Sequence, residues 1–271
     1  MEFLLDGARV RYADGGRGIA RTDSAVVLIH GSGMNRTAWQ FQTRYLSHHG
    51  FRAVAIDLPG HGGSDGPAPT AIPEMADWVG TVIAALDLGP AHLVGHSMGS
   101  YVGLEVAARM PEQAASLVLC GTAATMPVHP ELLDAATDNV AHASRLMTSW
   151  GFSSRGHTGV HASPGQWLLG GSTALLSTAP TGSLGIDMAA CQAYGGAIER
   201  ASEVSCPTTM VLGSADKMTP VRASVPLQEA FASAPEVVIL DGVGHMMMSE
   251  APDRVRQAIV DALHRGGNPT P

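Results

Sequence analysis

The stretch AHLVGHSMGSYVGLEVAARMP, residues 91–111, places a serine between two glycines where an apolar run gives way to a helical pattern. The start of the stretch is typical of a buried strand, and the residues from Met98 onward predict a helix. Gly95, Ser97 and Gly99 therefore form a G-x-S-x-G motif in a strand-turn-helix context. Side chains at the two glycine positions would collide with the neighbouring strand and helix, so the glycines permit a sharp turn that leaves the serine hydroxyl exposed.

Further apolar runs along the chain are typical of strands buried on both faces of a parallel sheet. They cover residues 24–31, 51–60, 115–121, 206–216 and 235–245. Near the N-terminus, Asp6-Gly7 between two short strand-like segments predicts a β-hairpin. Amphipathic segments such as residues 74–89 alternate with the runs. This alternation predicts an α/β fold, with a doubly wound, mostly parallel β-sheet and helices on both faces.

The alternation stops between residues 125 and 205, where small and polar residues are common and no strand-like run appears. Within this stretch, residues 183–201 have a helical pattern. We therefore expect a core formed by residues 1–124 and 206–271, with residues 125–205 inserted after the sixth strand of the sheet.

The composition limits the kinds of partner that the chain is expected to have. Of its 271 residues, 45% are hydrophobic, the formal net charge is −8, and Lys217 is the only lysine. Without a basic run, nucleic-acid binding is not expected. The chain shows no signal peptide and no apolar run of membrane-spanning length, so we expect a cytoplasmic protein without a membrane partner. The cysteines, at positions 120, 191 and 206, are too few and too scattered to predict a disulfide framework or a metal site. No pattern indicates an oligomeric state.

Reactive side chains follow several of the predicted strands, at the edge of the sheet where ligands bind in open parallel sheets. The hydroxyl of Ser97 needs a base, and a histidine oriented by a carboxylate can supply one. Asp216 and His245 each follow a later strand, so the order Ser97, Asp216, His245 is the one expected for a catalytic triad on such a sheet. Asp241 is a rival acid, but it lies on the same connection as His245, and we favour Asp216.

Acyl transfer to serine places a negative charge on the former carbonyl oxygen, and two backbone N–H groups should bind that oxyanion. One is the N–H of Met98, directly after the nucleophile. The other should come from the loop HGSG after an early strand, with the N–H of Ser32 as the first choice and that of Gly33 as the alternative. This chemistry needs no metal and no organic cofactor, and its partner is a small-molecule substrate.

Six segments together resemble the α/β-hydrolase superfamily: VLIHGSG, AIDLPGHGGSD, LVGHSMGS, LVLCGT, CPTTMVLGSADKMTP and GVGHMMMSEAPDRV. They occur in the family's order and cover nearly all of the chain outside residues 125–205. The resemblance implies a nucleophile at Ser97, an acid at Asp216 and a base at His245. It also implies that the inserted residues form a mostly helical cap over the active site.

The resemblance leaves several kinds of chemistry open. A serine nucleophile excludes the branches of the superfamily that use aspartate. We expect an esterase-like serine hydrolase that cleaves a small ester or related acyl compound through an acyl-enzyme intermediate. The alternatives are a carbon–carbon bond hydrolase, because HGSG resembles the loop of such enzymes, and a cofactor-free perhydrolase, because some of these share the Ser-Met pair. A small-molecule receptor on the same fold is a further alternative.

Candidate pocket residues come from the inserted segment and from the loop that carries His245. Asp187, Cys191 and Tyr194 are spaced to share one face of a helix, which could look into the pocket and contact a polar group of the substrate. The other interpretation is that Cys191 and Tyr194 pack the insertion against the core while Asp187 caps the helix. Trp150, Trp167 and Met246 are candidate pocket walls by their position in the chain.

Overall fold

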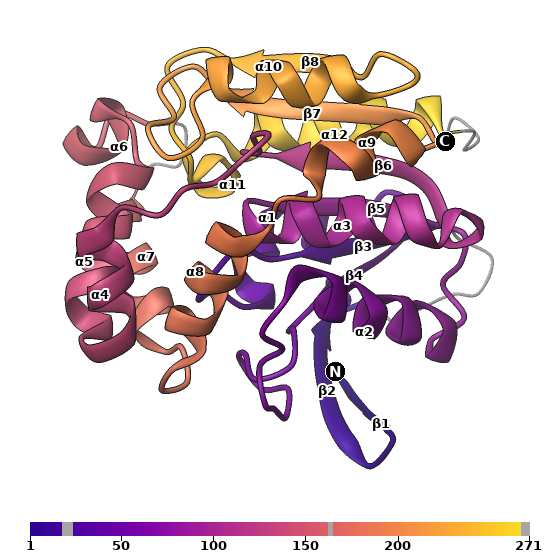
Figure 1. The fold of residues 1–271 in the computed structure, drawn as a ribbon, viewed down its shortest axis with the longest axis horizontal. Helices are drawn as coiled ribbons and strands as arrows, with labels where there is room; N and C mark the ends of the chain where they lie inside the picture. The colour runs from indigo at the N-terminus through magenta and orange to yellow at the C-terminus, as the bar shows by residue number, and fades with distance from the viewer. Residues whose placement is uncertain (18–23, 162–164, 267–271) are drawn as a thin grey trace.

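The computed structural model describes residues 1–17, 24–161 and 165–266. Its centre is an eight-stranded sheet in the order β1-β2-β4-β3-β5-β6-β7-β8 (Figure 1). The strands are β1 (Glu2–Leu5), β2 (Ala8–Ala13), β3 (Ser24–Ile29), β4 (Phe51–Ile56), β5 (Ala91–His96), β6 (Ala114–Cys120), β7 (Thr208–Gly213) and β8 (Glu236–Leu240). Strands β3 to β8 run parallel, and β1 and β2 join antiparallel at one edge. The mostly parallel sheet predicted from the sequence is therefore confirmed.

The N-terminal hairpin turns at the dipeptide predicted for it. Asp6 and Gly7 have φ angles of 49° and 83°. Two successive residues in the left-handed region are the mark of the tight hairpin turn whose twist matches that of the flanking strands. The hairpin thus supplies the two antiparallel strands of the sheet.

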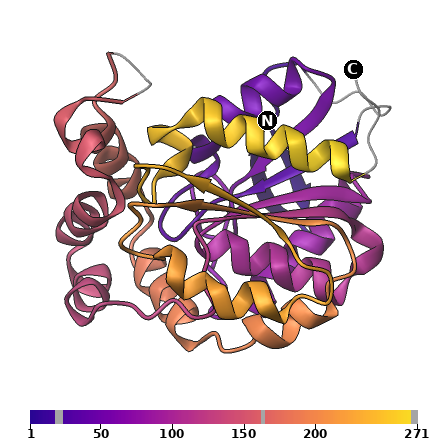
Figure 2. The ribbon, with the colours of Figure 1, turned by 90° about the horizontal axis from the view of Figure 1, so that it is seen from above.

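Helices cover both faces of the sheet. The helices α1 (Gln40–Ser47) and α12 (Pro252–Arg265) pack against each other on one face. The other face carries α2 (Ile72–Ala85), α3 (Met98–Arg109), α9 (Ala197–Glu203) and α10 (Val221–Ala230). Figure 2 shows α12 above the sheet and α10 below it. Short helical turns complete the core: η1 (Arg36–Trp39), η2 (Pro111–Gln113) and α11 (Met247–Glu250).

The central strands are buried on both faces because their side chains alternate between two hydrophobic cores. On β3, Val27 and Ile29 pack into the core beneath α2 and α3, whereas Val26 and Leu28 pack into the core beneath α1 and α12. All four are fully buried. This two-sided burial explains why these strands are continuous apolar runs in the sequence rather than alternating ones.

Helices joined by loops make up the described residues between β6 and β7, and none of these residues forms a strand. The helices are α4 (Pro130–Asp138), α5 (Val140–Gly151), α6 (Ser154–Thr158), α7 (Leu168–Ser177), α8 (Ser183–Ala193) and α9. Helices α4 to α7 stand together at one end of the sheet, and α8 runs back toward the core (Figures 1 and 2). The last helix, α9, packs directly on α3 of the core. The insertion therefore returns to the core layer before β7 begins.

Candidate active site

Ser97 lies at the sharp turn between β5 and α3, with φ 52° and ψ −119°. This left-handed backbone is costly for a residue with a side chain, and such strain is typical of functional sites. A Cβ atom on Gly95 would lie 2.1 Å from the carbonyl oxygen of Gly99, and one on Gly99 would lie 2.4 Å from that of Ile29. The collisions inferred from the sequence are therefore present, and the glycines make the turn possible.

Asp216 and His245 form a buried pair at the ends of β7 and β8. Oδ2 of Asp216 lies 2.8 Å from Nδ1 of His245. The other carboxylate oxygen accepts the backbone N–H groups of Met218 and Thr219, each at 2.8 Å. The hydroxyl of Thr219 donates to Oδ2 at 2.8 Å. Burial favours the neutral acid, but the attraction to His245 and these hydrogen bonds outweigh it and lower the pKa of Asp216.

The rival acid, Asp241, lies elsewhere. It is exposed, and its carboxylate accepts a hydrogen bond from the hydroxyl of Ser214 at 3.3 Å. A carboxylate in water with a surface serine as its partner does not orient the buried ring of His245. The geometry thus favours Asp216 over Asp241 as the orienting acid.

Two histidine rings lie beside the serine, and their hydrogen bonds separate their roles. The rings of His96 and His245 are 4.7 Å apart, centroid to centroid. Nε2 of His96 donates to the backbone oxygen of His245 at 2.9 Å. Burial, together with the neighbouring His245, lowers the pKa of His96 to about 3, so that ring stays neutral. His96 therefore supports the loop that carries His245, and within the described part of the chain no carboxylate is hydrogen-bonded to its ring.

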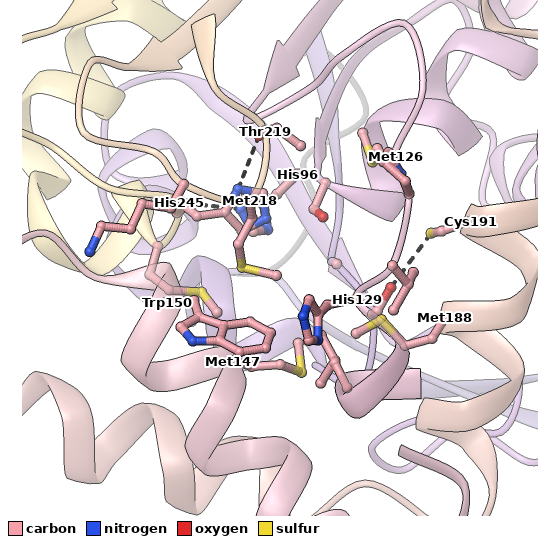
Figure 3. Close-up of a pocket in the computed structure, with 18 of the residues that line it drawn as sticks. His96, Met126, His129, Met147, Trp150, Met188, Cys191, Met218, Thr219 and His245 are labelled. Atoms are coloured by element: carbon pink, nitrogen blue, oxygen red, sulfur yellow. Dashed lines mark hydrogen bonds between the residues drawn. The ribbon is translucent and has the colours of Figure 1, made fainter. Parts of the chain in front are cut away.

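Ser97 and His245 open into one cavity of about 280 Å³. Its wall is rich in methionine, with Met34, Met126, Met147, Met188, Met218 and Met246 all lining it. Figure 3 shows several of these thioethers, together with Trp150 and His129, around the same space as His245. The rings of Trp150 and His129 meet edge to face, with centroids 5.3 Å apart. Trp150 and Met246 thus lie in the cavity wall, whereas Trp167 is exposed and does not line this cavity.

Asp187 and Tyr194 do not line this cavity, although their helical spacing led us to expect them to face it. Asp187 is fully buried, and its Oδ2 accepts the N–H of Gly33 at 2.7 Å. Tyr194 lies just beyond the end of α8, and its hydroxyl donates to Glu105 on α3 at 2.7 Å. This face of α8 packs on the core and on the loop after β3, so both side chains have partners inside the protein. Cys191, on the same helix, does reach the cavity wall.

The loop after β3 brings Ser32 to the cavity wall. The N–H of Gly33, the alternative oxyanion donor, is already bonded to Asp187. Within the described residues, no acceptor is bonded to the N–H of Ser32 or to that of Met98. Of the two donors considered in this loop, Ser32 is therefore the one whose N–H remains available for a ligand.

The structure adds two residues to the site that the sequence analysis did not place there. Lys217 and Thr219 line the cavity because they follow Asp216 in the turn after β7. Both residues could have been proposed from the sequence, because they lie within three residues of Asp216 in the segment GSADKMTP. Among the described residues, no group of three or more His, Cys, Asp or Glu side chains is arranged to hold a metal ion. None of the described helices is long and apolar enough to cross a membrane.

The sequence profile of the alpha/beta hydrolase family matches residues 26–258, a range that begins in β3 and ends in α12. The chain belongs to the alpha/beta hydrolase family. The fold and the resemblance expected from the sequence are thereby confirmed.

Several relatives of this alpha/beta hydrolase are hydrolases by name, which agrees with the expectation that the chain is an enzyme. An (E)-2-((N-methylformamido)methylene)succinate hydrolase of Acinetobacter baylyi is 42% identical over 88 residues, 32% of this chain and 33% of that protein. A pimeloyl-[acyl-carrier protein] methyl ester esterase of Methylococcus capsulatus is 45% identical over 103 residues, 36% of this chain and 37% of that protein. The chain thus matches only about a third of each relative's length.

A solved structure of a thermophilic esterase is similar over the whole chain. It superposes with a TM-score of 0.81 at 26% sequence identity, covering 98% of both chains. The fold of the chain is therefore similar to that of an esterase.

Proposed function

We propose that the protein is a serine hydrolase that cleaves a small ester or related acyl compound through an acyl-enzyme intermediate on Ser97. One observation carries the proposal. A serine held in a strained strand-to-helix turn opens into the same cavity as His245, whose Nδ1 lies 2.8 Å from the buried carboxylate of Asp216. This combination of a projecting hydroxyl, a base and an orienting acid is what activation of a serine requires.

The proposed reaction begins when Oγ of Ser97 attacks the carbonyl carbon of the substrate. Because Nδ1 of His245 faces Asp216, the free Nε2 accepts the serine proton. The carbonyl oxygen becomes an oxyanion, which accepts hydrogen bonds from the N–H groups of Ser32 and Met98. When the tetrahedral intermediate collapses, the imidazolium returns its proton to the departing alcohol, and an acyl ester remains on Ser97.

Hydrolysis of the acyl-enzyme repeats these steps with water as the nucleophile. His245 removes a proton from water, water oxygen adds to the acyl carbon, and the same N–H groups hold the second oxyanion. Collapse breaks the bond to Oγ of Ser97, which regains the proton from His245 as the carboxylic acid leaves. Asp216 remains ionised throughout, because its pKa is held below the ordinary value of an aspartate.

The cavity supports a small and largely apolar acyl group. Its volume of about 280 Å³ is at the low end for small-molecule sites, which typically span roughly 300–1,000 Å³. Thioether side chains adapt to irregular apolar shapes, so the methionine wall suits an aliphatic chain. Helices α4, α5 and α8 provide several of these wall residues, including Leu132, Met147 and Met188. We accordingly propose that residues 125–205 act as a cap that shapes the acyl site.

The similarity to esterases supports the same proposal. The pimeloyl-[acyl-carrier protein] methyl ester esterase acts on an ester by its name, and the thermophilic esterase shares the fold over the whole chain. Ester cleavage needs only the parts described above, with water as the second nucleophile.

Steady-state hydrolysis of 4-nitrophenyl acetate, butyrate and octanoate by the parent and by Ser97→Ala tests the proposal. We expect turnover of the short esters, reduced by about a million-fold in the variant, as when the nucleophile of a serine protease is removed. Equal rates for the two proteins would overturn the mechanism. A single acylation without turnover would instead indicate a receptor. Cleavage of a dienone ring-fission product in preference to every ester would indicate a carbon–carbon bond hydrolase, and peracid formation from peroxide and acetate would indicate a perhydrolase.

A further inference from the structure

One face of α8 contacts the loop that carries the proposed oxyanion donor. Leu184, Asp187 and Cys191 lie on that face at helical spacing. A Cβ atom on Gly33 would lie 2.6 Å from Cδ1 of Leu184, so the backbone of Gly33 rests directly on this leucine. Sγ of Cys191 lies 3.7 Å from Oγ of Ser32, a contact that Figure 3 marks. The helix thus supports the loop at two successive residues.

Asp187 makes the strongest of these contacts. Its Oδ2 accepts the N–H of Gly33 at 2.7 Å and Nε2–H of His61 at 2.9 Å. Both Asp187 and His61 are fully buried. Within the described residues, the second carboxylate oxygen has no hydrogen-bond partner, so both bonds depend on one atom. Loss of this carboxylate would leave a buried backbone N–H in the loop without an acceptor.

His61 neutralises the buried carboxylate. Its Nδ1 lies 3.0 Å from the carbonyl oxygen of Pro59, and its Nε2 faces Asp187, so both ring nitrogens act as donors. A histidine that donates from both nitrogens is an imidazolium. Burial opposes that charge, but the hydrogen bond and the attraction to Asp187 outweigh burial and raise the pKa of His61. The N–H of Gly33 therefore donates to a carboxylate, that of Asp187, which His61 holds in place and neutralises.

We propose that Asp187 is a positioning residue for catalysis. Through the N–H of Gly33 it fixes the peptide that follows Ser32, and it thereby holds the N–H of Ser32 toward the oxyanion. The inference rests on the proposed function, because it gives α8 a part in the oxyanion site. Helix α8 belongs to the inserted segment, so this segment contributes to transition-state stabilisation as well as to the shape of the pocket. A displacement of such a donor by about 1 Å can reduce the rate by about a hundredfold.

Asp187→Leu and Asp187→Asn separate positioning from folding. Leucine removes the acceptor. In Asp187→Asn, the amide oxygen can take the place of Oδ2 and accept both N–H groups, so the geometry can survive without the charge. Tyr194→Phe is the matched control, since it removes another buried hydrogen bond between the same segment and the core, to Glu105, without touching the loop. The readouts are kcat and KM for 4-nitrophenyl butyrate, the Ki of an aliphatic trifluoromethyl ketone, and the melting temperature.

We expect Asp187→Leu to lower kcat by about ten- to a hundredfold with little change in KM. The ketone Ki should rise by a similar factor, because Ser97 adds to that carbonyl to form a hemiketal oxyanion in the same site. Asp187→Asn should keep most of the parent kcat, and Tyr194→Phe should change the melting temperature alone. If Asp187→Leu does not fold, Leu184→Ala replaces it, with the expectation that kcat falls and the ketone Ki rises more than in Tyr194→Phe.

An unchanged kcat and Ki in folded Asp187→Leu, or equal losses in Asp187→Leu and Tyr194→Phe, would overturn the inference while leaving the proposed function intact. Absence of ester turnover in the parent, by contrast, would remove the proposed function first. The two failures are therefore distinguishable in one set of assays.

Discussion

The two walls of the cavity are built in different ways. At the ends of β5, β7 and β8, polar side chains are fixed by tight turns and short hydrogen bonds, as in the 2.8 Å contact between Asp216 and His245. Opposite them, helices α4, α5 and α8 present Leu132, Met147 and Met188. The first wall supplies reactive groups in fixed positions, and the second supplies adaptable apolar surface. Chemistry and substrate preference should therefore respond to different substitutions.

In the wall formed by the ends of β5, β7 and β8, removal of the charge on Asp216 should cause a large loss of kcat. In Asp216→Asn we expect kcat to fall by about 10⁴-fold, as when the orienting aspartate of a serine protease becomes asparagine and the histidine adopts the wrong tautomer. Asp241→Asn is the matched control, because Asp241 is exposed and lies on the connection that carries His245. Stopped-flow and steady-state assays with 4-nitrophenyl butyrate measure both. Similar losses in the two variants would mean that Asp216 is not the orienting acid.

Replacing a glycine by alanine should change the free energy of unfolding in opposite directions at the turn after β5 and in the helical segment between β6 and β7. In Gly99→Ala the new Cβ would lie 2.4 Å from the carbonyl oxygen of Ile29. Because that oxygen belongs to the backbone, the start of α3 or the end of β3 must shift to make room. We expect a loss of about 3 kcal/mol in the free energy of unfolding. Gly171 in α7 has no atom near the corresponding position, so Gly171→Ala should gain about 0.5–1 kcal/mol from helix propensity. Urea denaturation measures both, and a stable Gly99→Ala would contradict the tight turn.

The charge at the cavity should influence the choice of substrate. Lys217 is exposed, it is the only lysine in the chain, and no Asp or Glu accompanies it among the described residues that line the cavity. We expect Lys217→Gln to lower kcat/KM for mono-4-nitrophenyl succinate by up to about fivefold relative to the neutral butyrate ester. Added salt should reduce the difference. Arg222→Gln, on the exposed side of α10, is the control, and an equal loss on both esters in Lys217→Gln would argue against charge recognition.

The buried pair of His61 and Asp187 should make stability depend on pH. Because the folded-state pKa of His61 is raised, its contribution is complete below the unfolded value of about 6.5 and is lost as the pH rises through the raised value. His30 packs on His61 with ring centroids 5.0 Å apart, but burial and His61 lower the pKa of His30 to about 3, so it stays neutral over this range. Asp57, also nearby, favours the charged form of His61.

The difference in unfolding free energy between the parent and Asp187→Asn should therefore shrink from pH 6 to pH 9. The half-exposed pair of His142 and Glu131 provides the control, because Glu131→Gln makes the same chemical change at a site screened by water. Chemical denaturation across the pH range measures both differences. A constant difference for Asp187→Asn would mean that His61 does not carry the charge.

The positions of the proposed catalytic residues in the fold could be predicted because they depend on local sequence. Ser97 directly follows β5, and Asp216 and His245 lie in the loops just after β7 and β8; parallel strands bring such positions to one edge of the sheet. The glycines at 95 and 99 identify the turn without reference to anything distant. For the same reason, Thr219 joins the site through its proximity to Asp216 in the sequence.

The contacts of Asp187 could not be predicted because its partners are distant in the chain. Gly33 and His61 lie 154 and 126 residues away, on two different loops. Helical spacing showed that Asp187 and Cys191 share a face, but the direction of that face depends on how α8 docks on the core. Tyr194 lies past the end of the helix, where the spacing rule no longer applies. The methionine wall likewise forms from residues scattered over the whole chain.

Covalent labelling with a fluorophosphonate tests most directly whether Ser97 is the activated nucleophile. The serine oxygen attacks phosphorus, fluoride leaves, and the protein keeps the phosphonyl group as a stable adduct. We predict one adduct per chain, found by peptide mass spectrometry on Ser97, formed slowly in His245→Ala and absent in Ser97→Ala. Labelling at another residue, or ester hydrolysis that continues after complete labelling of Ser97, would contradict the account.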